Sequence, residues 1–314
     1  MLKTNCKFGA LDVKKEVIKL IDLHIHTTNS DGTDTPIQIL KLAEEKGLKY
    51  ISITDHDTCK SYYDLKEVNI SEYYSGKIVN GVELKCIYKG RNIDVLGYKF
   101  DLDKMNNWLK EFYKEKTRIK TQTKYFDILY NVCEKLNLTI SKKEDIVWNP
   151  EFDWASVTIY HELEKYKEEN KDKLPEDIWE SFTVFSKKYC ADKNGPWYID
   201  KSKDYPSIEE GIRAIKDAGG LVFMPHLFIY KWAKDKEEFI NDIIDNYDID
   251  GIECYHSQFD ESNIEYMLKI TEEKNLLRSG GTDYHGKNKP GLEFATGFNN
   301  FLHIDEKIIE NWVE

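Results

Sequence analysis

The sequence lacks several features that would assign it to common protein classes. No apolar run approaches the about 20 residues needed to cross a bilayer, and residues 1–17 lack the apolar core of a signal peptide. The six cysteines include no CxxC pair, which argues against a zinc ribbon or a disulfide framework and for reduced thiols. Acidic residues outnumber basic ones, with 57 Asp and Glu against 45 Lys and Arg. We therefore expect a cytoplasmic protein with no membrane contact, no broad affinity for duplex DNA and no obligate protein partner.

What the 314 residues do contain is an alternation of short apolar runs with helix-like segments. Residues 17–26 and 49–54 have the composition of strands. Between them, Thr35 and Pro36 predict the start of a helix that Gly47 ends, which completes a βαβ pattern. The later pattern predicts two strands around a turn at Gly90 within residues 77–100, strands at 221–226, 248–256 and 276–285, and helices at 207–220 and 261–276.

The alternation breaks between residues 103 and 203, where the chain is charged, aromatic and helix-periodic. We expect this segment to be an inserted helical subdomain. An α/β barrel would then comprise residues 19–102 and 204–300, with terminal extensions at 1–18 and 301–314.

Side chains that can bind metals recur at the ends of the predicted strands, namely His24, His26, His56, His226, Asp283 and His285, and Glu83 follows the start of another strand. In a β/α barrel the carboxyl ends of the strands form one rim, so residues distant in sequence converge there. His24 and His26 project from the same face of a strand, which suits two nitrogen ligands on one ion. Asp31 adds an oxygen donor, and mixed histidine and carboxylate shells suit manganese, iron or zinc rather than calcium or magnesium.

Five segments, "DLHIHTTNSDGTDTP", "ISITDHDT", "NGVEL", "MPH" and "SGGTDYHG", resemble in order and spacing the motifs of the PHP (polymerase and histidinol phosphatase) domain family. The resemblance runs from about residue 19 to about residue 300. It is greatest to the TrpH-like stand-alone branch of phosphoesterases, which also carries a helical insertion at this place. It implies a distorted (β/α)7 barrel that holds two or three divalent ions, manganese first, with iron or zinc as alternatives.

The resemblance also implies roles for single residues. His24, His26, Glu83 and Asp283 would bind one ion, Glu83 would bridge to a second, Asp31, His56 and His285 would serve another, and His226 would complete a third site. Where the family has a histidine after the glutamate, this sequence has Asp94, a carboxylate that can still ligate. Arg118 stands where an arginine of the branch reaches the substrate phosphate. His226 and His256 are the candidates for a catalytic acid.

These residues predict a metal-dependent phosphoric ester hydrolase. Divalent ions would screen the charge of the phosphate and lower the pKa of bound water toward ~7, so that a metal-bound hydroxide attacks the ester. We expect a small phosphorylated substrate, either a nucleotide such as a nucleoside bisphosphate or the 5′ end of a short single-stranded RNA. Two alternatives stay open: a small-metabolite phosphatase of the histidinol-phosphate type, and a non-catalytic metal-binding PHP module.

Overall fold

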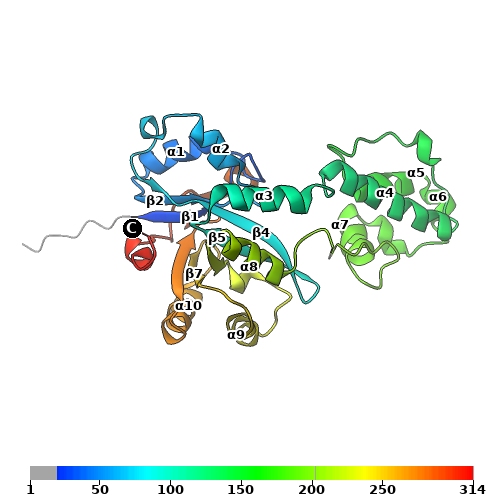
Figure 1. Ribbon diagram of the computed structural model, residues 1–314. Coiled ribbons are helices and arrows are strands. Elements are labelled where there is room, and N and C mark those ends of the chain that lie inside the picture. Colours follow the sequence, from blue (N-terminus) through cyan, green and yellow to red (C-terminus); the bar gives the residue numbers. More distant parts are fainter. Residues whose placement is uncertain (1–19, 202, 314) are drawn as a thin grey trace, which may run out of the picture. The chain divides into compact units, whose positions relative to one another are not determined.

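The computed structural model describes residues 20–201 and 203–313, which form two units (Figure 1). The first unit contains the described residues up to Glu83, Leu96–Phe100, and those from Gly219 onward. The second unit contains Leu84–Val95 and Asp101–Ala218. The predicted N-terminal extension lies outside the described residues. None of the helices in the described ranges has the length and apolar character needed to span a membrane.

A βαβ unit begins the first unit, as the sequence predicts. Strand β1 (Ile21–Ile25) and strand β2 (Tyr50–Ile53) are parallel, and helix α1 (Pro36–Glu45) connects them. The Thr35 hydroxyl accepts from the backbone N–H of Gln38, whose side chain bonds the N–H of Thr35 in return. After α1, Gly47 takes a positive φ of 64°, which glycine adopts without strain. Strand β3 (Lys77–Ile78) extends this sheet beside β2, and helix α2 (Lys60–Lys66) lies between the two in sequence.

A second sheet has the strand order β4-β5-β6-β7-β8. Its strands are β4 (Gly81–Tyr88), β5 (Arg91–Tyr98), β6 (Leu221–Met224), β7 (Gly251–His256) and β8 (Leu277–Gly281). Lys89 and Gly90, both at positive φ, form the predicted turn between β4 and β5. Helix α9 (Lys236–Asn246) connects β6 to β7, and helix α10 (Glu261–Glu273) connects β7 to β8. A short antiparallel pair, β9 (Leu292–Glu293) and β10 (Gly297–Phe298), follows.

The expected (β/α)7 barrel is confirmed only as a mixed α/β fold. Over the described residues the strands fall into separate sheets, and their pairing does not close a barrel. Two features explain the difference. Strand β5 pairs antiparallel with β6, which interrupts a parallel β/α repeat, and β3 contributes only two residues. The two larger sheets nevertheless approach each other where Ile25 forms an isolated bridge with Tyr284.

The apolar core of the first unit determines which side of β1 carries the polar residues. Ile21 and Leu23 are fully buried in a cluster that includes Tyr98, Phe223 and Ile304. Because side chains alternate along a strand, Asp22 and His24 face the opposite side. The strand therefore presents one apolar face to the core and one polar face, with Asp22 and His24, to the opposite side.

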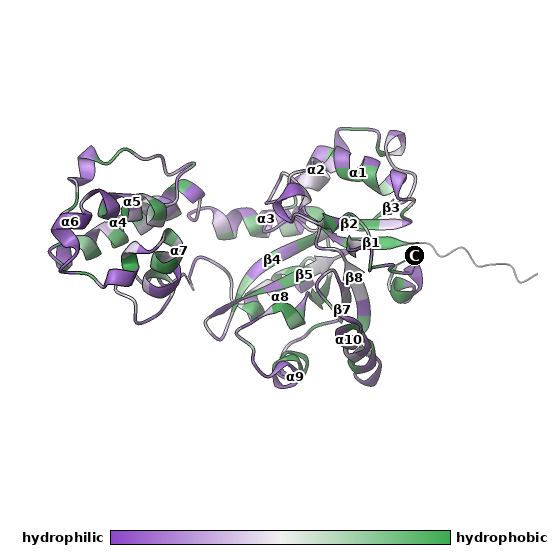
Figure 2. Cartoon of the chain, turned by 180° about the vertical axis from the view of Figure 1, so that it is seen from behind, coloured by the Kyte–Doolittle hydropathy of each residue, from purple (hydrophilic) through white to green (hydrophobic). Residues whose placement is uncertain are grey.

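The second unit is mainly helical, as predicted. Its helices are α3 (Leu102–Tyr113), α4 (Arg118–Lys135), α5 (Ala155–Lys165), α6 (Lys167–Asn170), α7 (Phe182–Val184) and α8 (Ile208–Asp217). Trp197, Phe185 and Leu129 are fully buried in its own apolar cluster. Hydrophobic and hydrophilic segments lie side by side on the helices of both units, as expected of amphipathic helices (Figure 2). The predicted boundaries of the insertion, 103–203, stay a prediction.

Candidate metal centre

Apart from Asp94, the histidines and carboxylates predicted to bind metal lie in the first unit. They come from the end of β1, the loops after β1, β2 and β8, and the start of β4. Two groups of potential ligand atoms lie wholly within this unit, each with all its atoms within 4.8 Å of one another: His24, His26, Glu83 and Asp283, and then His26, Asp31, His56 and His285. The structure therefore brings together seven residues that span more than 260 positions of the chain.

The first group surrounds the carboxylates of Glu83 and Asp283 and is buried. Glu83 Oε2 lies 3.2 Å from His24 Nε2 and 3.1 Å from His26 Nε2. Asp283 Oδ1 lies 3.6 Å and 3.4 Å from the same two nitrogens. Both imidazoles thus direct Nε2 toward the same pair of oxygens, which is the arrangement that a shared cation requires.

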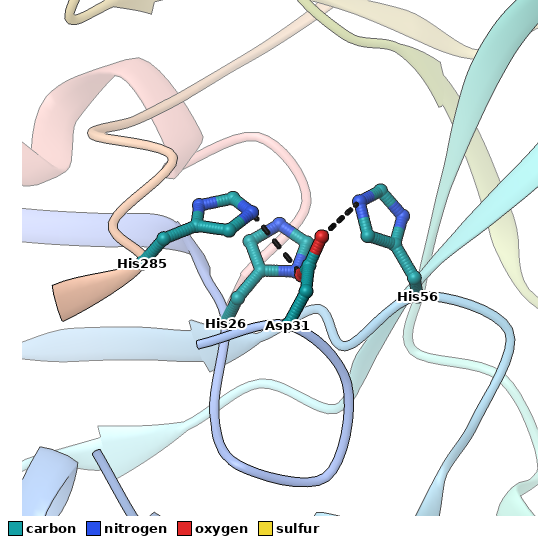
Figure 3. Close-up of side chains that lie close together, drawn as sticks. All are labelled: His26, Asp31, His56 and His285. Atoms are coloured by element: carbon teal, nitrogen blue, oxygen red, sulfur yellow. Dashed lines mark ion pairs between the residues drawn. The ribbon is translucent and has the colours of Figure 1, made fainter. Parts of the chain in front are cut away.

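The second group surrounds Asp31, whose carboxylate lies between two imidazoles (Figure 3). Its Oδ1 is 3.2 Å from His285 Nε2, and its Oδ2 is 3.7 Å from His56 Nε2. His26 joins this group through Nδ1, which is 3.6 Å from Asp31 Oδ1. His26 therefore faces both groups, whereas the sequence assigned it to the first group alone.

Charge pairing shifts the acid–base equilibria of these buried groups. Burial lowers the pKa of the His26 imidazole, but the carboxylates of Asp283 and Glu83 raise it more, to about 9. Burial would raise the pKa of Glu83, yet the charges of His24 and His56 hold it well below its usual range. In the same way, the charge of His24 outweighs burial and holds the pKa of Asp283 low. Protons on the imidazoles thus balance the carboxylates, and a divalent cation could take their place.

The donor set fits a divalent transition metal. The Nε2 atoms of His24 and His26 are buried without a well-directed hydrogen bond, which is costly unless an ion or proton partner compensates. Imidazole nitrogens combined with carboxylate oxygens favour manganese, iron or zinc.

Two further histidines contact the cluster. His226 places Nε2 2.9 Å from Glu83 Oε1, and its backbone is in the left-handed region, with φ 35°. His256 is fully buried, with Nε2 3.2 Å from Asp283 Oδ2. Because the N–H of Gln258 donates to His256 Nδ1 at 3.2 Å, the proton of a neutral His256 lies on Nε2 and points at Asp283. His256 is therefore not a surface residue.

Asp94 and Arg118 belong to the second unit. Asp94 lies half-buried on β5. Arg118 begins α4, where Nε donates to the carbonyl of Glu151 at 2.7 Å and Nη2 to that of Phe152 at 2.9 Å. Its guanidinium stacks on Trp154, 4.3 Å from the ring centroid. The roles of Asp94 in metal binding and of Arg118 in phosphate binding stay predictions.

The sequence reasoning missed three charged residues at this site. Asp22 accepts from the N–H and hydroxyl of Thr282, at 2.9 and 2.5 Å, and burial raises its pKa to about 6. Glu253 bonds His24 Nδ1 at 2.8 Å. The Lys289 ammonium donates to the carboxylate of Asp283 and to its carbonyl. For Asp22 and Glu253 the sequence offers one signal, a carboxylate within an otherwise apolar strand segment. A carboxylate is costly to bury without a partner.

Comparison with known proteins agrees with this geometry. Residues 22–177 match the family model described as the PHP domain. The phosphoribosyl 1,2-cyclic phosphate 1,2-diphosphodiesterase of Eggerthella lenta is 24% identical over 271 residues, which cover 85% of this chain and 94% of that protein. The 5′-3′ exoribonuclease Rnm of Escherichia coli is 23% identical over 272 residues, 85% of either chain.

A solved structure from Bifidobacterium adolescentis, described as that of a metal-dependent phosphoesterase, is similar in fold. The TM-score is 0.58 at 23% identity, and the similarity covers 94% of this chain and 97% of the other. This similarity shows a shared fold, and the match to the family model, with the converging histidines and carboxylates, shows that the chain belongs to the PHP domain family.

Proposed function

We propose that the protein hydrolyses phosphate esters of nucleotides, either nucleoside bisphosphates or the 5′ end of short RNA, with two or three divalent ions bound to the cluster. The observation that carries the proposal is the pair of ligand groups that share His26 within one unit. His24, His26, Glu83 and Asp283 would hold one ion, and Asp31, His56 and His285 would hold another. His226 and Asp94 would complete a third site. The distorted (β/α)7 barrel that the resemblance implies is part of the same proposal.

Manganese is the proposed metal, with iron or zinc as alternatives, because the donors are imidazole and carboxylate. When bound, such ions supply Lewis acidity that screens the phosphate and lowers the pKa of coordinated water toward ~7. The protein's own contribution is to fix the donors. Asp283 is held by Lys289 and by His256 Nε2, both on Oδ2, so that Oδ1 remains directed at His24 and His26. This position supports His256 as a residue that orients Asp283, and His226 as the remaining candidate for the catalytic acid.

The relatives support a ribonucleotide substrate. One relative is named an exoribonuclease and another acts on a phosphoribosyl cyclic phosphate. A cyclic phosphate of a ribose is the second candidate, favoured by the similarity over 94% of the Eggerthella enzyme.

A substrate screen with Mn²⁺ tests the proposal. The panel would contain mononucleotides, nucleoside bisphosphates, 5′-phosphorylated RNA oligomers, a ribose cyclic phosphate and histidinol phosphate, with His24→Ala as the inactive control. We expect release of phosphate or nucleotide from a ribonucleotide substrate. Turnover of histidinol phosphate alone would establish the metabolite phosphatase instead. If no phosphate ester is hydrolysed by a metal-loaded protein, the non-catalytic module is correct.

A further inference from the structure

Glu253 on β7 is a fully buried carboxylate that contacts no solvent. Its two oxygens have different partners. Oε1 lies 2.8 Å from His24 Nδ1, and Oε2 accepts the backbone N–H of His226 at 2.8 Å. The two partners come from different strands, since His24 is on β1 and His226 follows β6. One side chain therefore connects two residues proposed to bind metal.

The contact with His24 determines which nitrogen faces the cluster. When the Nδ1–H donates to Glu253, the lone pair of a neutral imidazole is on Nε2, the atom directed at Glu83 and Asp283. A carboxylate in this position also raises the basicity of the imidazole and hence its strength as a ligand. Without Glu253, His24 could rotate or take the other tautomer.

The contact with His226 stabilises a strained backbone. His226 has φ 35° and ψ 41°, in the left-handed region that residues with a Cβ seldom adopt. Its N–H bond to Glu253 Oε2 stabilises this conformation, in which Nε2 lies beside Glu83 Oε1. The Glu253 carboxylate thus helps to orient the imidazole rings of both His24 and His226.

We propose that Glu253 is a positioning residue that orients His24 and His226 for metal binding. The inference rests on the metal site of the proposed function. Glu253 itself contributes no ligand atom to either group of the cluster. Its effect acts through the two histidines.

The experiment compares Mn²⁺ binding by wild type, Glu253→Gln and Glu253→Asp, each stripped of metal and titrated in a calorimeter. Glutamine keeps the size, but its NH₂ group must face one of the two N–H donors, so we expect Mn²⁺ affinity to fall by about 10- to 100-fold. Aspartate is one methylene shorter and cannot reach both partners, so we expect an intermediate loss. Glu265→Gln, an exposed change on α10, removes the same charge and should leave the affinity unchanged.

Urea unfolding of the same proteins in chelator separates positioning from simple stability. A purely structural role would lower the urea midpoint of Glu253→Gln and leave the Mn²⁺ affinity at the wild-type value, which would overturn the inference. Should Glu253→Gln fail to fold, wild-type affinity in Glu253→Asp would overturn it as well. Absence of Mn²⁺ binding by wild type would instead contradict the proposed function, so the two failures are distinguishable.

Discussion

Replacing Glu83 with glutamine should destabilise the metal-free protein most at mildly acidic pH. Glu83 is buried and lies within 3.3 Å of nitrogens of His24, His26 and His56. The pKa of His26 rises from 6.5 to about 9, which corresponds to 2.5 × 1.36, or about 3.4 kcal/mol. Glu83 and Asp283 together cause this rise in pKa. Removing the Glu83 charge should therefore cost about half of the linked stabilisation, roughly 2 kcal/mol.

The sign of the pH dependence follows from the direction of that shift. A histidine whose pKa is raised in the fold contributes its full stabilisation below the unfolded pKa of about 6.5 and loses it as the pH passes 9. The loss in free energy of unfolding caused by Glu83→Gln should therefore be greatest near pH 6. It should shrink above pH 9, where the wild type keeps a buried carboxylate without charged partners. Urea unfolding in chelator at pH 6 and at pH 10 measures this loss for the variant against wild type. An equal loss at the two pH values would refute the charge pairing.

Four further substitutions test single roles. His24→Ala or Asp283→Ala should abolish turnover and retain a cooperative unfolding transition, because the apolar core carries most of the stability; near-normal activity would remove them from the site. Asp94→His should make activity saturate at lower Mn²⁺, because it restores the histidine that the resemblance implies for this position, and a titration identical to wild type would exclude Asp94 as a ligand. Arg118→Ala should raise KM without moving the Mn²⁺ titration, whereas a shifted titration would contradict a role in phosphate binding.

Local signals explain what the sequence predicted well. The start of α1 follows from Thr35 and Pro36, and its end from Gly47, because capping involves only neighbouring residues. The pairing of His24 with His26 is equally local, since alternation along a strand places both on one face. These features depend on a few adjacent positions, and the structure places them as expected.

Long-range contacts explain what the sequence did not reveal. Glu253 bonds His24 across 229 positions, and the run "GIECYH" does not show which residue is the partner of its carboxylate. Likewise, no sequence feature distinguishes Lys289, whose ammonium donates to Asp283 in the structure. The antiparallel pairing of β5 with β6 likewise joins segments more than 100 residues apart. This pairing makes the sheet mixed.

The metal content of the purified protein tests the central claim most directly. Elemental analysis of gently purified wild type should find two to three divalent transition ions per chain, manganese first, and chelator should remove both the ions and the phosphoesterase activity. His24→Ala, treated identically, should retain fewer ions. A protein that is folded, free of metal and fully active in chelator would contradict the account.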